Sequence, residues 1–230
     1  MMQLVPVSAN FLQAAVRVGS GAMGDRVQDR IAGCRICAER FAGTVTGHEP
    51  RPVVWFRPGA RILIASQAPG LRVHEAGTPF WDRSGQRLRD WMGLGEDVFY
   101  DRSRVAIVPM AFCFPGYDSS GADLPPPRIC ADTWREAALQ EVGGVALTLL
   151  IGGHAQRWHL GAEAARGGVT ATVARWRDHG PNMLALPHPS WRNTGWLRRN
   201  PWFEGDVLPV LRRRVAKALG SFQDGRCDSI

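Results

Sequence analysis

Four short apolar runs, separated by stretches of helical character, constrain the fold of this chain more than any other feature. The runs cover residues 61–66, 104–112, 146–152 and 183–187, and glycine, proline or polar residues bound each of them. Such runs are typical of strands that are buried on both faces. Alternation of strands with helices indicates crossover connections between parallel strands. We therefore predict a three-layer α/β/α sandwich around a central four-stranded parallel sheet.

The segments around these runs carry the predicted helices. At 230 residues the chain suits one domain, with its core at about residues 26–219. Pro209 suits the first turn of the last helix, and residues 116–127 have the composition of a loop. We expect residues 221–230 to form a flexible tail. Helices are expected at residues 11–18, 24–32, 84–93, 130–142, 154–160 and 206–219.

The net charge of +7 is carried almost entirely by arginine, since Lys217 is the single lysine. A GC-rich coding bias explains the excess of arginine over lysine but not the net charge, which favours a polyanionic partner. No apolar run approaches the roughly 20 residues of a membrane span, and the first residues lack the pattern of a signal peptide. We expect a monomeric cytoplasmic protein that does not bind membranes.

Five cysteines are informative in such a protein, because disulfides are rare in a reducing compartment. Cys34 and Cys37 form a C-x2-C pair, Cys113 directly follows the second apolar run, and Cys130 comes after sixteen intervening residues. Thiolates from separate segments are typical metal ligands, although Cys113 and Cys130 are equally compatible with small buried apolar residues. Spacing does not distinguish zinc from an iron–sulfur cluster. Cys227, in the expected tail, is predicted to play no part.

Several short motifs follow the apolar runs, where ligands of parallel sheets bind. They are SQAPG at residues 66–70, GTPF at 77–80, SGQ at 84–86 and HPS at 188–190. Their order, with four cysteines in register, resembles the uracil-DNA glycosylase superfamily and most closely its iron–sulfur-containing family 4, from about residue 34 to 219. The resemblance implies a [4Fe-4S] cluster bound by Cys34, Cys37, Cys113 and Cys130; structural zinc is the alternative.

The resemblance also implies roles for the motif residues. Phe80 would stack on a flipped base, although a core position is the common fate of phenylalanine. His188 would stabilise the departing uracil anion near O2, although a histidine after a strand is often only a satisfied polar residue. The remaining substrate contacts are expected from the turn after the first run and from the segment that begins with HPS, namely Gln67, Ala68, Gly70, Ser190 and Asn193.

Two positions depart from the family 4 pattern. Gln67 stands where that family has glutamate, and an amide cannot act as a base or balance the positive charge that develops on the sugar as the bond to the base breaks. Either another carboxylate takes this role, or DNA phosphates stabilise the cationic sugar. We expect Glu75 to supply the carboxylate, with Asp82 or Asp118 as alternatives. Pro109 stands where the family has an asparagine that reads uracil. Backbone groups of residues 110–112 are the expected replacement.

Residues 191–202 interleave tryptophan with arginine, and in the superfamily the corresponding loop enters the DNA minor groove. We expect Arg192, Arg198 and Arg199 to contact phosphates; the alternative is a tryptophan-rich lid packed on the core. No lysine near the motifs could form a Schiff base. Together with this, the resemblance implies a monofunctional uracil-DNA glycosylase that uses water and leaves an abasic site. The alternatives are an enzyme for other deaminated bases, such as hypoxanthine or xanthine, and a non-catalytic module that binds damaged DNA.

Overall fold

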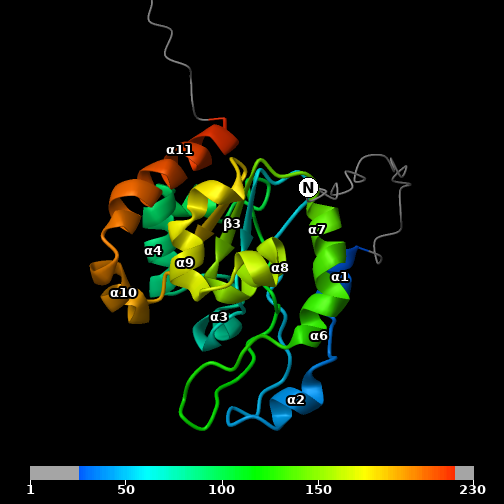
Figure 1. Cartoon of the computed structure of the whole chain (residues 1–230). Coiled ribbons are helices and arrows are strands. Elements are labelled where there is room, and N and C mark those ends of the chain that lie inside the picture. The colour runs from blue at the N-terminus through cyan, green and yellow to red at the C-terminus, as the bar shows by residue number, and fades with distance from the viewer. Residues whose placement is uncertain (1–25, 221–230) are drawn as a thin grey trace, which may run out of the picture.

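The computed structural model describes residues 26–220 and contains a four-stranded parallel sheet (Figure 1). The strands are β1 (Ile62–Ala65), β2 (Val105–Ile107), β3 (Leu147–Ile151) and β4 (Met183–Leu186), in the order β2-β1-β3-β4. Each neighbouring pair is parallel, which confirms the predicted sheet. The helix expected at residues 11–18, and the tail with Cys227, lie outside the described residues.

Helices cover both faces of the sheet, because successive strand residues point to opposite faces. Ile62 and Ile64 pack with α4 (Arg83–Met92), α9 (Gly168–Ala174) and α11 (Leu208–Ala218). Leu63 packs on the other face with α1 (Val27–Ala32) and α7 (Glu136–Val142), and Ala65 packs there with α8 (Gly152–Ala164). Figure 1 shows α4 and α11 to one side of β3 and α1 and α7 to the other. The three-layer α/β/α sandwich is thus confirmed.

The helix expected at residues 130–142 is a longer helical stretch with an irregular centre. It begins as α6 (Arg128–Cys130), widens to a π-helical segment over Ala131–Arg135 and continues as α7. The last predicted helix likewise combines a π-helical turn, Phe203–Val207, with α11, whose first turn contains Pro209. Before residue 191 the structure adds five short elements: α2 (Ala38–Ala42), α3 (Leu71–Ala76), α5 (Glu96–Phe99), α9 and the 3-10 turn Trp176–His179.

Two sequence predictions are wrong in extent. The second strand stops at Ile107 rather than at residue 112, because β1 ends at Ala65 and the Met110 and Ala111 N–H groups donate to Ser66 and Gln67 in the turn after it. Residues 191–202 are not an open loop: they form a 3-10 turn at Trp191–Asn193 and then α10 (Thr194–Arg199). No helix within residues 26–220 is long and apolar enough to cross a membrane.

Candidate active site

A cavity of about 660 Å³ opens at the carboxyl edge of the sheet, bounded by residues that follow β1, β2 and β4. Its volume is in the range of pockets that bind small ligands. Segments far apart in the sequence meet here, as the parallel topology requires. The structure brings eight predicted site residues to this one cavity: Gln67, Ala68, Gly70, Phe80, His188, Ser190, Arg192 and Asn193.

Other predicted residues lie outside the cavity. Glu75 is exposed on α3, and its carbonyl oxygen accepts a hydrogen bond from Arg51 at 2.9 Å. Asp118 also does not line the cavity, and Arg198 and Arg199 are exposed on α10. Among the alternative carboxylates named from the sequence, Asp82 alone lines the cavity.

Several lining residues were not predicted from the sequence. They are Asp123 and Tyr117 of the loop at residues 116–127, together with Arg72 at the start of α3 and Arg83 at the start of α4. The two arginines follow the SQAPG and GTPF motifs closely, so proximity to a motif could have identified them. Nothing local marks Asp123, because its place depends on how the loop folds over the sheet edge.

The backbone of Phe80 is held in an unusual conformation. Its φ of 55° is the only positive φ of a non-glycine residue among residues 26–220, and such outliers cluster at functional sites. A Cβ at Gly85 would lie 1.7 Å from the Phe80 carbonyl oxygen, so only glycine fits there. Asp82 Oδ1 accepts a hydrogen bond from the Gly85 N–H at 2.9 Å. The GTPF and SGQ motifs therefore act as one unit that fixes Phe80.

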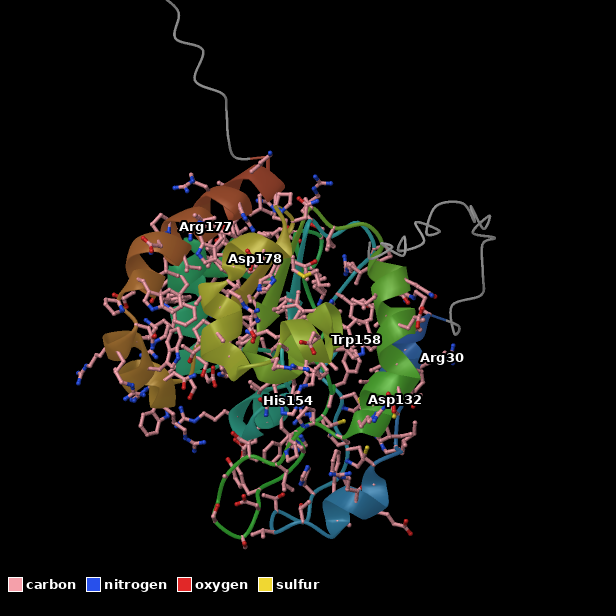
Figure 2. The ribbon with its side chains drawn as sticks, in the orientation of Figure 1. Arg30, Asp132, His154, Trp158, Arg177 and Asp178 are labelled. Atoms are coloured by element: carbon pink, nitrogen blue, oxygen red, sulfur yellow. The ribbon has the colours of Figure 1, made fainter. Side chains whose placement is uncertain are left out.

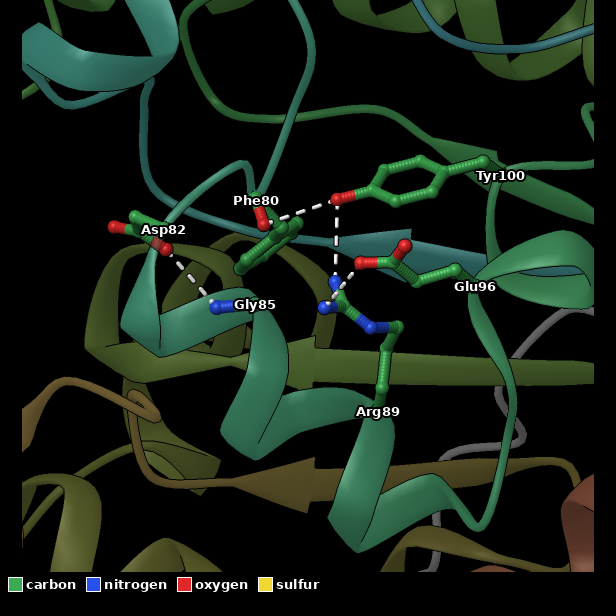
Figure 3. Close-up of polar contacts among 6 residues, drawn as sticks. All are labelled: Phe80, Asp82, Gly85, Arg89, Glu96 and Tyr100. Atoms are coloured by element: carbon green, nitrogen blue, oxygen red, sulfur yellow. Dashed lines mark hydrogen bonds and ion pairs between the residues drawn. The ribbon is translucent and has the colours of Figure 1, made fainter.

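A hydrogen-bond chain extends this unit (Figure 3). The Tyr100 hydroxyl donates to the Phe80 carbonyl oxygen at 3.1 Å, and Arg89 donates to the Tyr100 hydroxyl at 3.2 Å and to Glu96 at 2.8 Å. The Phe80 ring itself packs edge-on against Phe99, with centroids 6.1 Å apart. Helices α4 and α5 thus position the aromatic wall of the cavity.

The HPS motif fixes the tautomer of His188. The Ser190 N–H donates to His188 Nδ1 at 3.2 Å, so the neutral ring carries its proton on Nε2. Asn193 Nδ2 donates to the His188 carbonyl oxygen at 2.7 Å. Burial lowers the pKa of His188 below its ordinary value of 6.5, while the nearby carboxylates of Asp82 and Asp123 oppose this shift. His188 is therefore a neutral hydrogen-bond donor, and Ser190 serves mainly to orient it.

The turn after β1 is tied to the segment after β2. The Met110 N–H donates to the Ser66 carbonyl oxygen at 2.9 Å, and the Ala111 N–H donates to that of Gln67 at 3.1 Å. The Phe112 N–H donates to Cys130 Sγ at 3.4 Å. All three N–H groups are therefore hydrogen-bonded within the protein, and recognition of a base by backbone groups of residues 110–112 stays a prediction. The Gln67 amide, in contrast, has no hydrogen-bond partner within residues 26–220.

The four predicted cysteine ligands line a second, smaller cavity, of about 20 Å³, whose other walls are almost entirely apolar. Trp134 Nε1 donates to Cys34 Sγ at 3.3 Å, so two of the four sulfurs accept N–H hydrogen bonds. Burial and the neighbouring cysteines raise the pKa of Cys113 to about 12, and burial raises that of Cys130 to about 11. Without a cation both are thiols, because a thiolate in this apolar cavity has no compensating charge.

The four cysteines form a donor set that either a zinc ion or an iron–sulfur cluster can take. Within residues 26–220 no three His, Cys, Asp or Glu side chains are placed to hold one metal ion. A four-iron cluster is bound by four cysteine thiolates, and N–H groups commonly donate to its sulfurs.

Comparison with known families assigns the chain. A model of the Uracil DNA glycosylase superfamily matches residues 54–212, which is more than half of the 230 residues. The chain belongs to this superfamily. It is accordingly a DNA glycosylase, a hydrolase that acts on damaged bases in DNA. The match includes Phe80 and His188 but begins after Cys34 and Cys37, so it does not bear on the cysteine site.

Proposed function

We propose that this protein is a monofunctional uracil-DNA glycosylase of the iron–sulfur type. It would hydrolyse the N-glycosidic bond of a uracil flipped into the 660 Å³ cavity and leave an abasic site. The convergence of the Gln67–Gly70 turn, Phe80 and His188 on this single cavity is the observation that carries the proposal. Lys217, the only lysine, does not line the cavity, which supports water as the nucleophile.

The chemistry places charge at two points. As the bond between C1′ and the base breaks, the sugar becomes cationic and the base anionic. Phe80, fixed by its backbone, stacks on the base and excludes water from one face. His188 donates its Nε2 proton in a hydrogen bond to the developing anion at O2, and a neutral donor needs no proton transfer to do so. The lowered pKa of His188 keeps the ring neutral at physiological pH.

An amide side chain in the cavity suits recognition of the base edge. Gln67 has both its carbonyl oxygen and its NH2 group available, which match the N3–H donor and a carbonyl acceptor of uracil. Asn193 has already committed one N–H to the His188 carbonyl oxygen. Pro109 lines the cavity where family 4 has its uracil-reading asparagine. This substitution favours a second candidate function, excision of hypoxanthine or xanthine by the same site.

The DNA strand would lie across the mouth of the cavity. Arg72, Arg83 and Arg192 line the cavity and are exposed, and Arg198 and Arg199 extend the positive charge along α10. Trp191, at the same rim, is 63% exposed, which is unusual for so large an apolar side chain. These residues suit phosphate contacts and a wedge that fills the space of the flipped base.

We propose that Cys34, Cys37, Cys113 and Cys130 bind a [4Fe-4S] cluster. Through these four ligands the N-terminal segment would be linked to the residues after β2 and to α6. Anaerobic purification, a visible absorption spectrum and assays of iron and sulfide test this directly. We expect a brown protein that loses its colour in Cys113→Ala. One equivalent of zinc in a colourless protein would contradict the cluster.

The activity is tested with oligonucleotides that each contain one uracil, hypoxanthine or xanthine. We expect strand cleavage of the uracil substrate only after alkali, because a monofunctional enzyme leaves an intact abasic site. Cleavage confined to a purine substrate would shift the assignment to the second candidate. Tight binding without release of any base would indicate a non-catalytic module, and full activity in both Phe80→Ala and His188→Ala would refute the site.

A further inference from the structure

The cavity contains two carboxylates from residues 26–220, Asp82 and Asp123. This matters because Gln67, at the family's glutamate position, offers an amide that cannot accept a proton from water. Glu75 and Asp118, which the sequence also suggested, lie outside the cavity. Within residues 26–220, the carboxylate that assists cleavage of a base bound here must therefore be Asp82 or Asp123.

Asp82 already has a structural task. It is the N-terminal capping residue of α4, and its Oδ1 accepts the Gly85 N–H at 2.9 Å. Because Gly85 is the residue that admits the Phe80 carbonyl group, this hydrogen bond holds the aromatic wall of the cavity in place. Asp82 is thus committed to positioning Phe80.

Asp123 is the less committed carboxylate. Its only ion-pair partner within residues 26–220 is Arg192, at 3.9 Å, and its side chain is 45% exposed. An isolated β-bridge to Tyr117 holds the residue at the cavity rim. Asp118 shapes the same loop, because its Oδ1 accepts the N–H groups of Ser120 and Ala122 at 2.8 and 3.0 Å. The loop therefore has a defined form that presents Asp123 to the cavity.

We propose that Asp123 is the catalytic carboxylate of this glycosylase, an assignment that rests on the proposed function. The bond between C1′ and the base nitrogen breaks, and its electron pair leaves on the base. The oxygen of one water then bonds to C1′, and one proton of that water passes to the Asp123 carboxylate. The same proton later neutralises the released base anion, directly or through solvent. Before attack, the negative carboxylate also stabilises the cationic sugar.

The contact with Arg192 adds a consequence. Arg192 lies at the exposed rim, where a DNA phosphate would compete with Asp123 for its guanidinium group. At 3.9 Å this exposed pair is weak, so little is lost when the phosphate takes the arginine. Bound DNA would thus free the Asp123 carboxylate at the moment it is needed.

Four variants, two at Asp123, one at Asp82 and one control, test the assignment by single-turnover base excision at saturating enzyme, on the most active of the three substrates. Asp123→Asn keeps the size of the side chain but cannot accept the proton, so we expect a rate loss of about 100-fold. DNA affinity should change less than threefold. Asp123→Glu restores a carboxylate and should recover part of the rate. Asp178→Asn is the matched control, because Asp178 is exposed and does not line the cavity. It lies away from α3, which carries part of the cavity lining (Figure 2).

The outcomes separate this assignment from the proposed function. An Asp123→Asn rate within threefold of wild type would overturn the role of Asp123 while leaving the glycosylase intact. A larger loss in Asp82→Asn than in Asp123→Asn would move the role to Asp82. Failure of the wild-type protein to release any of the three bases would refute the proposed function itself, and the assignment with it.

Discussion

Replacement of Gly85 by alanine tests how the cavity wall is built. The added Cβ would lie 1.7 Å from the Phe80 carbonyl oxygen, whereas ordinary contact begins at 3.4 Å. The backbone of Phe80 must therefore move by about 1.7 Å, the difference between these two distances. This movement breaks the hydrogen bond from the Tyr100 hydroxyl to that oxygen.

The expected effects follow from this displacement. Loss of one hydrogen bond costs about 1 kcal/mol, and overpacking costs about 1–3 kcal/mol, so the free energy of unfolding should fall by about 2–4 kcal/mol. A catalytic group misplaced by about 1 Å costs about 100-fold in rate. We therefore expect Gly85→Ala to fold but to excise the base at least about 100-fold more slowly than wild type.

Single-turnover excision, with circular dichroism to confirm folding, measures this effect. Gly205→Ala is the matched control, since a Cβ there meets no atom within 4 Å and its φ is not positive. Excision by Gly85→Ala within threefold of wild type would refute the reasoning, because it would show that Phe80 does not need its present backbone conformation.

Three further predictions concern pH, salt and the wedge. Burial and Arg135 lower the pKa of His159 from 6.5 to about 3, so the unfolded chain binds this proton first as the pH falls below 6.5. The free energy of unfolding, measured by urea titration, should therefore fall by about 2 kcal/mol between pH 7 and pH 5. The fall should be smaller in His159→Gln, and an equal fall in the two proteins would contradict this. Arg198→Ala and Arg199→Ala should each lower the salt-dependence slope of DNA affinity by about 1, and unchanged slopes would remove them from the interface. Trp191→Ala should weaken DNA binding about tenfold while the exposed Trp158→Ala does not, and equal affinities would exclude the wedge.

The sheet and most of the cavity could be predicted from the sequence because both follow from local signals. Each apolar run is bounded by breakers, and parallel topology places the ends of the runs at one edge. The motif beginning at Gln67 and the one beginning at His188 each directly follow such a run, so their meeting required no knowledge of loops. The strand at 104–112 was overextended because the apolar run continues past Pro109, whereas its partner strand β1 ends at Ala65 and is followed by a turn.

The missing parts depend on contacts through space. Asp123 reaches the cavity only because the 116–127 loop folds over the sheet edge, and no periodicity encodes that path. Arg135 is fully buried and donates to the carbonyl oxygens of Val108 and Pro109, both at 2.9 Å. In the sequence it is one more arginine in a polar stretch of helix. Gly85 belongs to the SGQ motif, but the reason for a glycine there becomes visible only when the Phe80 carbonyl group is placed against it.

Release of free uracil from a single-uracil oligonucleotide, compared between wild type and His188→Ala under single-turnover conditions, tests the central claim most directly. The account predicts one free uracil per abasic site from the wild-type protein. It also predicts a loss of about 100-fold or more in His188→Ala with DNA binding retained, because the donor to the base anion is gone. Equal rates in the two proteins, or an oligonucleotide left intact by the wild type, would contradict it.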